Sequence, residues 1–127
     1  MTKPQIVSSF RILPLVAMLF FVLYGSASAL TIEPPELAPY TRSKVVFDHD
    51  AHNEKAGLAE NCVVCHHSGE KGVIDLKTSS EGTPCSECHA VKAKGNLTPL
   101  RRAYHQQCIF CHMKTDKGPT ACGECHK

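Results

Sequence analysis

The sequence has no tryptophan and few other aromatic residues, and it is too short to build a large apolar core. Of its 127 residues, 43% are hydrophobic, but the longest apolar run lies between Ile12 and Tyr24, and four of the eight aromatic residues fall in the first 24 positions. A domain of this size buries little surface per residue. An ordinary enzyme built on a hydrocarbon core is therefore excluded, and something else must hold the C-terminal part together.

A basic surface is also missing. The chain has 14 Lys and Arg against 12 Asp and Glu, with no run of five or more basic residues. Two of the basic residues, Lys3 and Arg11, belong to the N-terminal segment, and without them the two signs balance at 12 each. The sequence therefore lacks the basic segment that is typical of nucleic-acid-binding proteins.

The N-terminal segment has the three-part pattern of a secretory signal peptide. Basic residues precede an apolar run at 12–24, and the small residues Ala27-Ser28-Ala29 end it. This run is shorter than the ~20 apolar residues of a membrane-spanning helix, so we favour cleavage after Ala29 over an uncleaved membrane anchor. We predict a signal peptide at 1–29 and a domain at 30–127 that is exported to the periplasm and does not span the membrane once processed.

Eight cysteines and eight histidines are the outstanding features of what remains. The cysteines form four Cys-x-x-Cys-His motifs, at 62–66, 85–89, 108–112 and 122–126. Paired cysteines alone would permit zinc sites, a disulfide framework or haem attachment. A histidine directly after every second cysteine is the signature of c-type haem attachment, and zinc binding gives no reason for that placement. The motifs therefore predict four covalently bound c-type haems.

The spacing within each motif suits this chemistry. Two thiols three positions apart can reach the two vinyl groups on one edge of a porphyrin, and the next residue places an imidazole under the iron. The predicted thioether cysteines are Cys62, Cys65, Cys85, Cys88, Cys108, Cys111, Cys122 and Cys125. The predicted proximal iron ligands are His66, His89, His112 and His126.

Four histidines remain, which equals the number of sixth ligands that four irons require. They are His49, His52, His67 and His105. The competing ligand, methionine, occurs once after residue 29, at Met113. The count favours bis-histidine ligation of all four irons; the alternative is that one or two of these histidines lie on the surface and leave an iron five-coordinate.

Few regular elements are indicated between these ligands. The pattern predicts an extended lead-in at 31–39, a short strand at 45–47 and a loop at 79–84. A helix is predicted to begin with Thr98 as N-cap and Pro99 in its first turn. The expected fold is therefore mostly α with much irregular structure: a small multihaem domain organised around four haems, with a few short strands near the N-terminus.

Local spacing also constrains the distal histidines. His67 follows a proximal ligand directly, so it should reach a neighbouring haem. His49 and His52 share a face if they lie on a helical turn, yet they are too close to bind one iron from opposite sides. His105 lies one turn before the third motif, so one helix is expected to carry one haem and to ligate another. Phe47 and Tyr104 are predicted to pack against porphyrin faces.

With these motifs the chain resembles the class III cytochromes c, in particular the tetrahaem cytochromes c3 of sulfate-reducing and related anaerobic bacteria. The resemblance rests on the segment Phe47–His52, on the double histidine in Cys62–His67 and on the lone His105. It implies the ligand pairs His49 with His66, His52 with His112, His67 with His89 and His105 with His126. One departure is that all four cysteine pairs are separated by two residues, whereas many members separate those of the second and fourth motifs by four.

An iron with two imidazole ligands has no open position, which favours one-electron transfer over turnover of a small substrate. An imidazole rather than a thioether as the sixth iron ligand, together with solvent exposure of the haem, makes the reduction potential of the haem negative. We therefore predict a low-potential periplasmic electron carrier that is not an enzyme. By resemblance it would take electrons from hydrogenase or formate dehydrogenase and pass them to a membrane-bound multihaem complex or another terminal acceptor. The alternative is a small multihaem reductase for nitrite, sulfur species or a metal ion, with one labile haem site.

Overall fold

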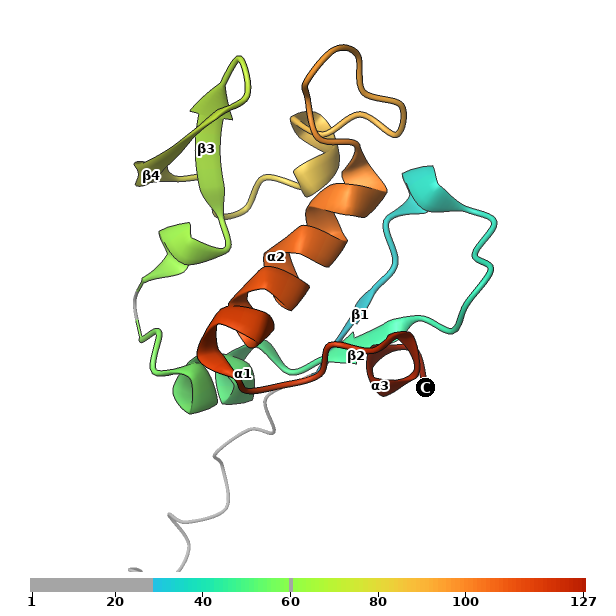
Figure 1. Ribbon diagram of the computed structural model, residues 1–127, viewed down its shortest axis with the longest axis vertical. Helices are drawn as coiled ribbons and strands as arrows, with labels where there is room; N and C mark the ends of the chain where they lie inside the picture. Colours follow the sequence, from blue (N-terminus) through green and yellow to red (C-terminus); the bar gives the residue numbers. More distant parts are fainter. Residues whose placement is uncertain (1–28, 60) are drawn as a thin grey trace, which may run out of the picture.

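The computed structural model describes residues 29–59 and 61–127, in which short elements alternate with irregular segments (Figure 1). The strands are β1 (Leu30–Ile32), β2 (Val45–Phe47), β3 (His67–Glu70) and β4 (Val73–Ser79). The α-helices are α1 (His49–Ala56), α2 (Leu100–Thr115) and α3 (Cys122–Cys125), and single 3₁₀ turns lie at η1 (Pro35–Leu37), η2 (Cys62–Val64) and η3 (Cys85–Glu87).

The longest element, α2, runs through the middle of the molecule, between the β3–β4 hairpin and the β1–β2 pair (Figure 1). The prediction of a helix through His105 and the third motif is confirmed. Its predicted N-cap was wrong by one residue, because Pro99 is the N-cap and Thr98 lies outside. Pro99 has an extended ψ of 151°, and its carbonyl accepts the first helical hydrogen bond, from Ala103 N–H at 2.9 Å.

Helix α1 is bounded by a side-chain cap and a left-handed residue. Asp48 accepts a hydrogen bond from the backbone N–H of Ala51 at 3.0 Å, and Gly57 ends the helix at φ 64°. Such N-cap carboxylates and αL glycines are typical helix boundaries. His49 and His52 therefore lie on one helical turn, which is the condition under which their three-residue spacing places them on one face.

Two antiparallel strand pairs complete the fold. Strand β2 pairs with β1, so the short strand expected at 45–47 is confirmed. The β3–β4 hairpin was not predicted. Its turn consists of Lys71 and Gly72, with φ values of 53° and 82°, and two consecutive residues with positive φ are typical of a type I′ hairpin turn.

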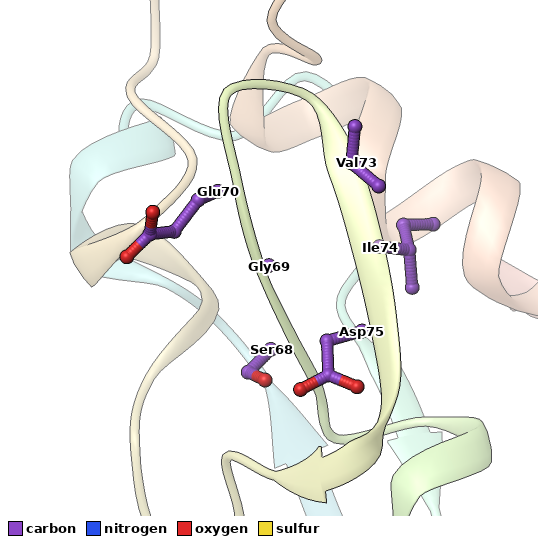
Figure 2. Close-up of a pocket in the computed structure, with 6 residues that line it drawn as sticks. All are labelled: Ser68, Gly69, Glu70, Val73, Ile74 and Asp75. Carbon is purple, nitrogen blue, oxygen red and sulfur yellow. The ribbon is translucent and has the colours of Figure 1, made fainter.

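A shallow hollow of about 450 Å³ lies on this hairpin (Figure 2). Six residues line it: Ser68, Gly69, Glu70, Val73, Ile74 and Asp75. Gly69 is required there, because a Cβ atom at this position would lie 2.3 Å from the carbonyl oxygen of Val73. None of the lining residues is a cysteine or histidine, so the hollow is separate from the residues predicted to bind haem.

Among the described residues, Leu100 is the only buried hydrophobic side chain, and no polar side chain is buried. Large apolar residues such as Val46, Val73 and Phe110 are more than half exposed. The small domain thus has few helices, short strands, much irregular structure and almost no hydrocarbon core. In the same part of the chain, no helix combines the length and the apolar character needed to cross a membrane.

Candidate haem-binding sites

Each Cys-x-x-Cys-His motif forms a helical turn. The third motif lies within α2, and the other three form η2, η3 and α3. In these three turns the N–H of the motif histidine donates to the carbonyl of the first cysteine, at 2.8 Å for His66, 2.8 Å for His89 and 2.9 Å for His126. The turn keeps both thiols and the imidazole of one motif close together. All eight cysteines are half-buried or exposed.

The four motif histidines each lie beside one of the four other histidines. The distances between ring centroids are 6.4 Å for His49 and His66, 6.1 Å for His52 and His112, 6.1 Å for His67 and His89, and 6.2 Å for His105 and His126. Two imidazoles that each bond one metal ion at about 2.0 Å hold their centroids roughly 6 Å apart. The residues present therefore fit a group whose iron is held between two imidazoles.

Four of these imidazoles donate a hydrogen bond from Nδ1 to a backbone carbonyl. The contacts are His89 with Thr98 at 2.9 Å, His105 with Arg101 at 2.7 Å, His112 with Pro119 at 2.6 Å and His126 with Ser43 at 2.6 Å. Because a carbonyl only accepts, the proton must lie on Nδ1, which leaves the lone pair of Nε2 available to a metal. The backbone thus sets both the tautomer and the orientation of these rings.

The two histidines of α1 have different surroundings. Nδ1 of His49 lies 3.1 Å from the carboxylate of Asp50, whereas Nδ1 of His52 is buried and has no hydrogen-bond partner in the described part of the chain. Burial lowers the pKa of His52, and the neighbouring His112 lowers it further. The neutral imidazole, which is the form that binds a metal, is therefore favoured at His52.

Aromatic and thiol groups gather around the same positions. The ring of Phe47 lies 4.9 Å from that of His52. Burial raises the pKa of Tyr104 to about 12, and the adjacent Cys85 contributes next. Burial likewise raises the pKa values of the free thiols of Cys65 and Cys108. That Phe47 and Tyr104 contact porphyrin faces stays a prediction.

Several residues that position the site were missed from the sequence. The carbonyls that orient the imidazoles carry no sequence signal, because every residue has a carbonyl. Gln107 of α2 donates to the carbonyl of Val64 at 2.8 Å and so connects the first and third motifs. Gly118 packs against His112, whose ring atoms would lie 2.7–2.9 Å from a Cβ atom at this position. A glycine three residues after a helix end signals a turn, but not a contact with a ligand.

The zinc alternative involves a different geometry. Within residues 29–59 and 61–127, no three cysteine, histidine or acidic side chains gather closely enough to hold a metal ion. The histidines instead meet in twos, each pair combining one motif histidine with one outside the motifs.

Comparison with known proteins identifies relatives of this chain. The model of the class III cytochrome C family matches residues 27–126. The chain is 32% identical over 106 residues to cytochrome c3 of Desulfovibrio desulfuricans and 31% identical over 103 residues to that of Maridesulfovibrio salexigens, in each case covering 76% of this chain and 91% of the relative. It is also 31% identical over 121 residues to the nine-heme cytochrome c of Desulfovibrio desulfuricans, covering 80% of this chain but only 33% of that protein.

The family match spans nearly all of the described residues and includes the four Cys-x-x-Cys-His motifs. It confirms the predicted cofactors, which are four c-type haems. The chain therefore belongs to the class III cytochrome c family and is a multihaem electron-transfer cytochrome.

Proposed function

We propose that this cytochrome is a low-potential periplasmic electron carrier in which two histidines ligate each of the four irons. The four imidazole pairs, with centroids 6.1–6.4 Å apart, carry this proposal. They agree with the pairs that the family resemblance implies, and they leave no histidine of the sequence without a partner ring. Two strong-field ligands on every iron favour outer-sphere electron transfer, because ligation need not change between oxidation states.

Bound c-type haems supply one-electron redox couples. In this proposal the eight motif cysteines attach the haems, and the turns of η2, η3, α2 and α3 fix each attachment relative to its proximal histidine. The distal histidines occupy the sixth positions and exclude water and small substrates. Carbonyls such as those of Thr98 and Pro119 hold the Nδ1 protons and keep each Nε2 directed toward its iron.

Export is part of the proposal. The predicted signal peptide, residues 1–29, lies almost wholly outside the described residues, which begin at Ala29. Cleavage after Ala29 would leave Leu30, the first residue of β1, at the N-terminus of the domain. Haem attachment and function in the periplasm would follow from this export.

Carbon monoxide tests the ligand set. We expect no binding to the reduced protein, because both axial positions of every iron are filled by imidazole. The His105→Ala variant should bind one carbon monoxide per protein, at the haem attached to Cys122 and Cys125. Optical titration of the dithionite-reduced proteins measures both. Ready binding to the unchanged protein would favour the small reductase with a labile site.

The proposed redox partners can be tested with the intact holoprotein. Hydrogenase under hydrogen, or formate dehydrogenase with formate, should reduce all four haems. We expect this because the proposed reduction potentials of the haems, although low, still permit electron transfer from these donors. The absorbance of the reduced haems follows the reaction, and samples without enzyme or without electron donor are the controls. A membrane-bound multihaem complex should then reoxidise the carrier. Failure of both dehydrogenases at catalytic concentration would contradict the proposed donors.

A further inference from the structure

Two ligand candidates on α1 differ in what their second ring nitrogen contacts, although they lie one turn apart. Nδ1 of His49 meets the Asp50 carboxylate at 3.1 Å, whereas Nδ1 of His52 is buried without a partner among the described residues. Four other imidazoles form a hydrogen bond through Nδ1, and in each case the acceptor is an uncharged backbone carbonyl. Asp50 differs from these four acceptors because its carboxylate carries a formal negative charge.

We propose that Asp50 is a positioning residue that tunes one haem: its carboxylate accepts the Nδ1 proton of His49 and makes the haem of the first motif harder to reduce than that of the third. The inference rests on the proposed ligand set, in which His49 shares an iron with His66, and His52 shares one with His112. It assigns a role to a residue outside the Cys-x-x-Cys-His motifs and outside the set of ligands.

The direction follows from the hydrogen bond. A carboxylate that accepts from Nδ1–H increases the basicity of Nε2, so the imidazole becomes a stronger donor to its iron. Stronger donation stabilises the ferric state, and a charge-assisted hydrogen bond has a larger effect than a neutral one. Nδ1 of His52 donates no such hydrogen bond to a carboxylate, because it has no partner among the described residues. The two haems should therefore differ in potential even though each has two histidine ligands.

Solvent limits the effect but does not remove it. The side chain of Asp50 is 78% exposed and that of His49 is 44% exposed, so water screens the long-range field of the carboxylate. Direct contact between Nδ1 and Oδ1 is the component that screening affects least. The influence of Asp50 should therefore be local to the first haem.

A second role of Asp50 has to be separated from this one. Asp50 lies in the first turn of α1, where a carboxylate interacts favourably with the helix dipole. If this were its only role, removing the charge would disturb α1 as a whole and alter both His49 and His52. Tuning through the hydrogen bond predicts a change at one haem alone.

The test compares Asp50→Asn with Glu54→Gln in the four-haem protein. Both changes remove one negative charge from α1, but only Asp50 contacts an imidazole. NMR-resolved stepwise oxidation gives the four potentials, and low-temperature EPR reports the ligand field of each ferric iron. We expect Asp50→Asn to raise the reduction equilibrium constant of the first haem about threefold, equivalent to about 30 mV at 59 mV per tenfold, with a changed EPR signal for that iron only.

Two results would overturn the inference: an equal shift in Glu54→Gln, which would indicate a diffuse charge effect, or equal shifts at the first and third haems, which would indicate a helix effect. Failure of the underlying ligand set is recognised separately. In that case His49→Ala would leave the number of low-spin irons unchanged, and both the ligand assignment and the role of Asp50 would fall together.

Discussion

Replacing both Cys108 and Cys111 with alanine is expected to abolish the folded domain, an effect larger than the loss of one haem. Both residues lie on α2, the central helix, whose only buried residue is Leu100. Burying one leucine contributes about 1.5–3 kcal/mol, and most of the stability of a helix in a protein comes from the packing of its apolar face. Without the third haem, little remains to hold α2 against the rest of the chain.

The same double substitution at Cys122 and Cys125 is the matched control. These cysteines are the first and last residues of α3, which has only four residues and lies near the end of the described chain. The control should lose one haem yet keep α2 and the other three sites. Mass spectrometry gives the number of haems, while circular dichroism and urea titration give the helix content and the free energy of unfolding. Equal stability of the two variants would show that α2 depends no more on the third haem than on the fourth, whose predicted distal ligand His105 also lies on α2.

The His52→Met variant is expected to have one haem with a much higher midpoint potential. A thioether in place of an imidazole raises the potential of a haem, and axial ligands as a group span about 0.8 V, so we expect a rise on the order of 0.1–0.3 V. His52 is the appropriate position, because its Nδ1 has no hydrogen-bond partner among the described residues and burial lowers the pKa of its ring. Methionine therefore leaves no carbonyl acceptor unpaired.

The control for this substitution is Ala56→Met. It introduces the same side chain one turn further along α1, at an exposed position. Potentiometric titration of both variants should show one component displaced upward in His52→Met and four unchanged components in Ala56→Met. If the highest potential of His52→Met equals that of the unchanged protein, His52 is not an iron ligand.

The arrangement of the histidines is the part of the structure that sequence reasoning anticipated most fully. Counting eight histidines against four irons predicted two per haem, and the resemblance supplied which rings should meet. The structure places those rings beside one another. The Cys-x-x-Cys-His spacing can be interpreted from the sequence because it is set by the chemistry of porphyrin attachment rather than by packing in a core. That each pair ligates an iron stays a prediction.

Other features lay beyond the sequence for identifiable reasons. The β3–β4 hairpin has a mixed polar and apolar sequence, and its turn places Lys71 where asparagine or glycine is usual, so the hairpin signal is weak. Thr98 is a common capping residue type, yet Pro99 takes the cap position, because its backbone carbonyl and not a side chain begins the helix. Asp50 resembles any exposed acidic residue until its distance to His49 is known.

The separation of the paired histidines along the chain bears on the order of assembly. Three of the pairs close loops of 17, 22 and 21 residues, whereas His52 and His112 close one of 60 residues. Since the entropic cost of closure grows as the logarithm of loop length, the long loop costs about 1 kcal/mol more than the shortest. The 60-residue loop also contains His66, His67, His89 and His105. The short loops should therefore close first, and joining α1 to α2 should be the late step that completes the domain.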